Sequence, residues 1–183
     1  MLVQEVIALA AETLGRTDLA EALAALEGEP EGDLKSLLRC YNLIENEVAL
    51  DFFPLKATER FSPEEKKISY ARFAFAPVHI LKVTDASDMP MSFTVMPTHL
   101  VVPTAGEAEV TYAYAPPEKS LKDETAFSDK ISARLLAFGV ASEFCITNRQ
   151  FSEGAMWGRR YRDALRAAGI YRRTLSVRSR RWI

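Results

Sequence analysis

The fold is decided by residues 131–146, which read ISARLLAFGVASEFCI. Only Arg134 and Glu143 carry a charge in this stretch, and its apolar residues recur on nearly every side of a helix. A helix that is apolar all round must bury its whole surface, so we expect it to be central in the protein. We predict that this helix spans about 128–147.

Helical periodicity continues on both sides of this stretch. Apolar residues recur at spacings of three and four before Pro54, and again before Gly169. Proline removes a backbone donor and glycine favours the end of a helix, so both residues mark helix ends. The further predicted helices span about 2–14, 18–27, 33–53 and 152–168.

Between these helices the pattern changes to an alternation of two. Residues 107–114 show it best, because every second side chain from Ala108 to Tyr114 is apolar. Residues 68–73 and 78–83 also have the composition of strands, and prolines and Asp/Ser turns separate these segments. We therefore predict a small antiparallel β region inserted at about 55–117.

The expected fold class is α+β, mainly α: a helical bundle with the inserted β region and an extended C-terminal arm. The 183 residues are enough for one domain with a sizeable core, and we predict a single domain over 1–170 followed by the arm, 171–183. With 48% hydrophobic and 26% charged residues, the composition is that of a globular protein. No apolar stretch reaches the roughly 18 residues of a membrane span, so no membrane association is expected.

Cysteine usage and the first residues indicate a cytoplasmic protein. Residues 1–7 lack the basic segment that opens a secretory signal. Cys40 and Cys145 fall in apolar helical stretches, where buried thiols are expected rather than a disulfide.

Charge is strongly polarised along the chain, although the formal net charge is only −2. Residues 159–183 carry nine arginines and one acid, Asp163, for a charge of +8. The preceding 158 residues carry 14 basic and 24 acidic side chains, for a charge of −10. Such a charge distribution attracts an anionic partner to the arginine-rich part.

Motifs that support catalysis are absent from the sequence. There is no phosphate-binding glycine loop and no nucleophile elbow. The two histidines, His79 and His99, are twenty residues apart, so no zinc site is expected. Glu143 is the one carboxylate inside an apolar helix; we expect it to pair with Arg134 or Arg39, and a hydrolase that uses it as an acid is the weaker hypothesis. We predict no enzymatic activity, no cofactor and no metal.

Three interpretations of the arginine-rich part remain open. The first is a solvated terminus without a function. The second is a nucleic-acid-binding accessory protein that neutralises phosphates with this region. The third is docking onto an acidic protein surface, since tryptophan and arginine are typical anchors of interfaces. The candidate residues on the last helix are one basic face, Arg159, Arg162 and Arg166.

The order of elements resembles the head-to-tail adaptor proteins, also called neck or head-completion proteins, of tailed bacteriophages and prophages. The resemblance runs from about Leu34 to Ile183. Its most specific part is the final pair of helices followed by the arginine-rich end. The segments that carry it are LLRCYNLIENEVA (37–49), FFPLK (52–56), VTYAYAPP (110–117), RLLAFGVASEFC (134–145), Phe151, MWGRRYRDAL (156–165) and SRRW (179–182).

The resemblance implies a structural virion protein located at the neck, and in the host cytoplasm during assembly. Copies would form a ring, typically twelvefold, on the portal protein; the ring would extend the DNA channel, without sequence-specific DNA binding, and offer a surface to a tail or tail-completion protein. Residues 1–170 would be the adaptor domain. The portal-docking arm would comprise Arg172, Arg173, Leu175, Val177, Arg178, Arg180, Arg181 and Trp182.

Overall fold

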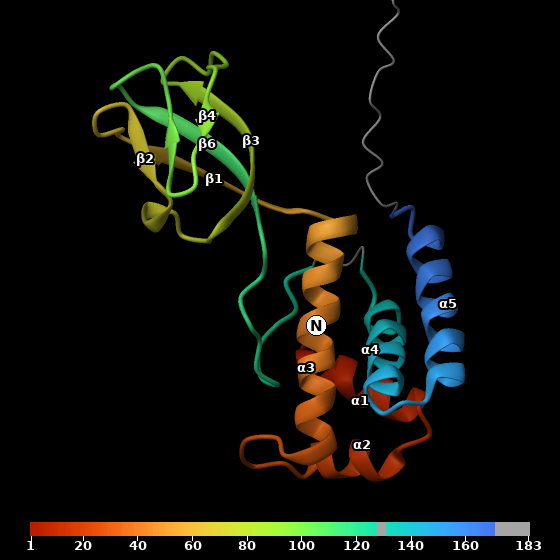
Figure 1. The fold of residues 1–183 in the computed structure, drawn as a ribbon. Helices are drawn as coiled ribbons and strands as arrows, with labels where there is room; N and C mark the ends of the chain where they lie inside the picture. Colours follow the sequence, from red (N-terminus) through yellow and green to blue (C-terminus); the bar gives the residue numbers. More distant parts are fainter. Residues whose placement is uncertain (128–130, 171–183) are drawn as a thin grey trace, which may run out of the picture. The chain divides into compact units, whose positions relative to one another are not determined.

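The computed structural model describes residues 1–127 and 131–170 and confirms an α+β fold (Figure 1). The chain forms two compact units, which are described separately. One is made of Met1–Glu47 together with the chain from Lys119 onward, and the other of Val48–Glu118. That residues 1–170 form a single domain stays a prediction.

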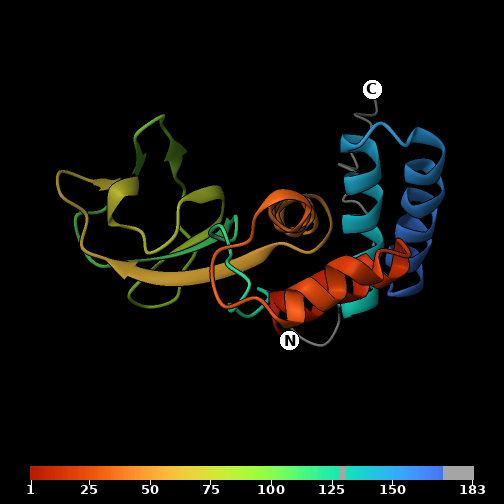
Figure 2. The ribbon, with the colours of Figure 1, turned by 90° about the horizontal axis from the view of Figure 1, so that it is seen from below.

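The first unit is helical. Its helices are α1 (Val3–Thr13), α2 (Thr17–Ala24), α3 (Gly32–Glu47), α4 (Ala133–Thr147) and α5 (Phe151–Ala167). The predicted position of residues 131–146 is confirmed, because α4 packs against α1, α3 and α5 (Figures 1 and 2).

A glycine sets how closely the neighbouring helices approach α4. A Cβ built on Gly139 would lie 2.8 Å from the side chain of Ile44 on α3 and 3.2 Å from the ring of Tyr161 on α5. On the α5 side, Ser142 donates a hydrogen bond of 2.9 Å to the carbonyl of Gly154. Small residues therefore allow α4 to be covered on two sides at short distance.

Two predicted helix bounds are wrong, and a third predicted helix changes type before its end. The helix predicted for 128–147 begins at Ala133, because Ser132 caps it: its hydroxyl accepts a hydrogen bond of 3.2 Å from the Leu135 amide. The helix predicted for 18–27 ends at Ala24. The helix predicted for 33–53 is helical to Phe52, but it is an α-helix only as far as Glu47. A π-helical turn over Val48–Phe52 follows, closed by a bond from the Phe53 amide to the Val48 carbonyl.

The second unit contains two antiparallel three-stranded sheets. One has the order β1 (Leu55–Phe61), β6 (Ala108–Tyr114), β3 (Pro77–Asp85). The other has the order β2 (Lys67–Ser69), β5 (His99–Val101), β4 (Thr94–Val95). The strand prediction for 107–114 is confirmed: Ala108, Val110 and Tyr112 are buried, and Tyr114 packs against the same core.

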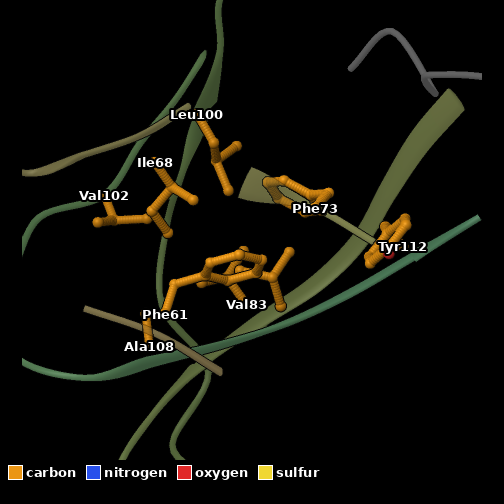
Figure 3. Packing of buried hydrophobic residues seen from close by; sticks show 9 residues of the cluster. Phe61, Ile68, Phe73, Val83, Leu100, Val102, Ala108 and Tyr112 are labelled. Carbon is orange, nitrogen blue, oxygen red and sulfur yellow. The ribbon is translucent and has the colours of Figure 1, made fainter. Parts of the chain in front are cut away.

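Side chains from both sheets form one hydrophobic core in this unit (Figure 3). Phe61, Val83 and Tyr112 come from the first sheet, while Ile68 and Leu100 come from the second. The strand predicted for 68–73 is wrong after Ser69. Its hydroxyl accepts a hydrogen bond from the Ala71 amide and starts a 3₁₀ turn, Tyr70–Arg72, after which Phe73 packs into the core.

Candidate interaction surfaces

An exposed row of side chains runs along α5; we call it the ridge. It consists of Phe151, Ala155, Arg159, Arg162 and Arg166. Spacings of three and four place these residues on one side of the helix, while Gly154, Gly158, Tyr161 and Leu165 face the interior. The three arginines are those of the predicted basic face, and all are exposed.

Most of the charge on the ridge is uncompensated. Arg166 pairs with Asp163, with 3.2 Å between the guanidinium and the carboxylate. Arg159 and Arg162 have no carboxylate partner in the described part of the chain. Phe151 adds an apolar side chain that is 66% exposed at the start of the same row. Exposed aromatic and arginine side chains in one row are typical of protein interfaces.

A stack of two arginines and two aromatic rings lies on the other flank of α5. The guanidinium of Arg134 lies 5.4 Å from the centroid of Phe138, whose ring stacks on Trp157 at 5.7 Å. The guanidinium of Arg160 lies 4.9 Å from the Trp157 centroid. The Phe138–Trp157 ring stack joins α4 to α5, and each cation–π contact adds an arginine from the same helix to one of the two rings. Trp157 is half-buried and contributes to packing between the helices.

The helical unit also contains an acidic groove with a volume of about 320 Å³. Leu23, Leu26, Pro30 and Leu38 supply its apolar lining, and Glu27 and Glu29 lie at its exposed edge. Lys122 is the basic residue in the lining. Neither Glu27 nor Glu29 has an ion-pair partner among the residues that the structure describes. The groove therefore combines apolar surface with free negative charge.

The ridge helix and the groove lie on opposite sides of the helical unit. The loop between α2 and α3, which carries Glu27 and Glu29, lies on one side of α3, whereas α5 lies beyond α4 on the other side (Figures 1 and 2). Residues 1–47 carry ten acidic and three basic side chains. The exposed glutamates of the α2–α3 loop and the exposed arginines of α5 thus lie on opposite sides of the helical unit.

The predicted portal-docking residues lie outside the described residues. This holds for Arg172, Arg173, Leu175, Val177, Arg178, Arg180, Arg181 and Trp182. Their role stays a prediction.

The other residues considered for chemistry do not gather into a site. Glu143 does not form the expected salt bridge with Arg134 or Arg39; Arg134 is instead held against Phe138. His79 is exposed on β3 and His99 lies on β5 of the other sheet. Within residues 1–127 and 131–170, no cluster of three or more His, Cys, Asp or Glu side chains could hold a metal ion. Cys40 and Cys145 are buried free thiols, as predicted, and burial raises the pKa of Cys40 to about 11.

One buried polar group was missed by the sequence analysis. Glu45 is 1% exposed, and its Oε1 accepts hydrogen bonds from the Tyr41 hydroxyl at 2.6 Å and the Ala126 amide at 2.7 Å. The available signal was a tyrosine four residues before a glutamate on the apolar side of a predicted helix. This pair links α3 to the segment that precedes α4.

Comparisons with known proteins give no identification. No protein-family model matches the chain, and a search of curated proteins finds no match. Among the described residues, no helix is both long and apolar enough to cross a membrane.

Proposed function

We propose that this protein is a head-to-tail adaptor of a tailed bacteriophage or prophage. In this proposal the helices form a bundle in a mainly α protein. Copies of the chain form a ring, typically twelvefold, on the portal protein at the neck of the virion. The ring extends the DNA channel and provides the attachment surface for a tail or tail-completion protein. The protein has no catalytic role.

The observation that carries this proposal is the charge polarity of the helical unit. A subunit of a closed ring meets two identical neighbours through two different surfaces, so its sides must be complementary rather than alike. Free arginines on α5 and free glutamates beside the α2–α3 loop have this relationship. The order of elements, which resembles the adaptor family, supplies the portal as the partner.

Residues 171–183 are assigned to the portal contact. They carry five arginines and no acid, together with Trp182. Arginine pairs well with carboxylates on an acidic protein surface, and tryptophan fills apolar pockets. Twelve copies of even a weak contact bind strongly when the ring is engaged as a whole.

The test is binding of the purified protein to its candidate portal ring. Full-length protein is compared with a variant truncated after Ile170, and decoration of the ring is followed by sedimentation and electron microscopy. Saturable decoration that is lost on truncation supports the proposal. Failure of the full-length protein to decorate the ring contradicts it. Circular dichroism of the truncated variant controls for folding.

A second candidate, a nucleic-acid-binding accessory protein, is favoured by one observation: Arg159 and Arg162 have no described carboxylate partner. It predicts DNA affinity that falls steeply with salt concentration, because each neutralised phosphate releases counterions. The ten acidic side chains of residues 1–47 oppose this function, since they repel DNA. Tight, salt-sensitive DNA binding that Arg159→Glu and Arg162→Glu abolish would favour this candidate over the adaptor.

A further inference from the structure

We propose that the ridge of one copy binds the acidic groove of a second copy. The ridge is Phe151, Ala155, Arg159, Arg162 and Arg166 on α5. The groove is the one lined by α2, the α2–α3 loop, α3 and residues 120–122, in which two glutamates face one basic residue, Lys122. This contact goes beyond the proposed function, because it assigns residues to self-association and does not require a portal. It rests on the adaptor proposal only for closure of the chain of copies into a ring.

Chemical complementarity selects this occupant for the groove. The lining of Leu23, Leu26 and Pro30 fits an apolar side chain, and Phe151 is 66% exposed. A groove of about 320 Å³ lies at the lower end of the range for small-molecule pockets, so it fits one or two large side chains. Burial of Phe151 there removes two apolar surfaces from water at once.

The charges match on the same surfaces. Arg159 follows Phe151 by eight residues, or about 12 Å along a helix, and Arg162 by about 16 Å. Arginine side chains on a helix extend back toward its N-terminus, and therefore toward Phe151. In the proposed contact Phe151 enters the apolar lining, and the guanidinium groups lie near Glu27 and Glu29 at the edge. Two free cations then meet two free carboxylates, and bidentate arginine–carboxylate pairs are strong and directional.

Placement on opposite sides of the unit determines the kind of assembly. Because α5 and the α2–α3 loop lie on opposite sides of the helical unit (Figures 1 and 2), a copy whose ridge is bound still has a free groove, and its neighbour still has a free ridge. Association is therefore head-to-tail, which produces a closed ring or a filament rather than a symmetric dimer.

Cross-linking of two mixed variants, each with one introduced cysteine, tests this contact. Ala155→Cys places a thiol on the ridge, and Gly28→Cys places one in the groove lining, where a Cβ meets nothing within 4 Å. Neither change removes a charge. Ser87→Cys, in an exposed turn of the β unit, replaces Gly28→Cys in the control mixture. Cys40 and Cys145 are buried and their thiol pKa values are raised, so they react slowly.

With full-length protein, diamide added as the two-electron oxidant and no portal present, we expect the ridge–groove pair to form a mixed disulfide dimer at least about tenfold faster than the control pair. Arg159→Glu with Arg162→Glu in the ridge variant should remove this excess. When the groove variant also carries Glu27→Arg and Glu29→Arg, the excess cross-linking should return, because the charges are then reversed on both surfaces.

Three outcomes overturn the proposal. The first is equal cross-linking of the two mixtures. The second is excess cross-linking of the ridge–groove pair that persists after charge reversal of the ridge but disappears when residues 171–183 are deleted. That result would mean that residues 171–183, and not the ridge, bind the groove. The third is reversal of the ridge that abolishes DNA binding but leaves cross-linking unchanged. Because the assay contains no portal, its result is separate from the outcome of the portal-decoration test.

Discussion

Tyr41 and Glu45 form a buried hydrogen bond one turn apart on α3. The Tyr41 hydroxyl donates to Glu45 Oε1 at 2.6 Å, and the two residues are 0% and 1% exposed. The same oxygen accepts the Ala126 amide at 2.7 Å, whereas Oε2 has no hydrogen-bond partner among the described residues. One carboxylate oxygen thus accepts two hydrogen bonds and ties the segment that precedes α4 to α3.

Removal of this carboxylate should destabilise the helical unit. Glu45→Ala leaves the buried Tyr41 hydroxyl and the half-buried Ala126 amide without their partner, and each unpaired buried donor costs about 1–3 kcal/mol. We therefore expect the free energy of unfolding to fall by about 2–5 kcal/mol, measured by urea denaturation. Glu12→Ala, at an exposed position of α1, is the control and should change stability little. Equal stability of the two variants would show that the buried pair contributes nothing.

The contribution of Tyr41 to the free energy of unfolding should be measurable from the dependence of stability on alkaline pH. Burial, followed by the hydrogen bond to Glu45 and its charge, raises the pKa of Tyr41 far above its usual value near 10. In the unfolded chain the Tyr41 hydroxyl loses its proton near pH 10. In the folded protein the hydroxyl stays protonated at this pH, so above pH 10 the unfolded state binds fewer protons than the folded state. Tyr41 therefore contributes its full stabilisation below pH 10 and progressively less above it.

The expected slope is about 1.4 kcal/mol of stability per pH unit above pH 10 for this one group. Tyr41→Phe should have lower stability at pH 7 and a shallower decline between pH 10 and 11. Denaturation of both proteins at several pH values gives the difference in slope. Parallel declines would mean that Tyr41 ionises equally easily in the folded state.

Close packing around Gly139 leads to a third prediction. Its Cβ position lies 2.8 Å from the Ile44 side chain and 3.2 Å from the Tyr161 ring, so Gly139→Val forces α3 and α5 away from α4. Overpacking of this kind costs about 1–3 kcal/mol. Thermal unfolding should show a lower Tm, while Gly28→Ala, which meets nothing within 4 Å, should leave Tm nearly unchanged. If the Gly139→Val protein had the same Tm as the parent, the helices around Gly139 would have room for a larger side chain, and the prediction would be wrong.

Prediction from sequence succeeded where local pattern alone decides structure. The nearly all-apolar residues 131–146 revealed the central helix, and spacing alone revealed the row Arg159, Arg162 and Arg166. Strand β6 followed from its alternation. In each case a single element carries the complete signal.

It failed where a side chain outside the periodic pattern determines the outcome. Ser69 turns the chain with one hydroxyl hydrogen bond, although residues 68–73 have strand composition. A glutamate such as Glu45 is expected at the surface, but Glu45 is buried because its carboxylate accepts hydrogen bonds from Tyr41 and from the amide of Ala126, which is distant in sequence. The acidic groove needs α2, α3 and residues 120–122 together, and no local pattern reports such a juxtaposition.

The β unit offers a last prediction, because its core joins two small sheets. Ile68 on β2 is 0% exposed and packs with Phe61 and Leu100, so Ile68→Ala leaves a cavity between the sheets. Such truncations cost about 2–5 kcal/mol. A three-stranded sheet has little other burial to compensate, so amide hydrogen exchange should accelerate throughout residues 55–114. Val95→Ala on β4 is the control, since Val95 is 59% exposed and little apolar burial is lost. Acceleration confined to β2 alone would show that the two sheets do not share one cooperative core.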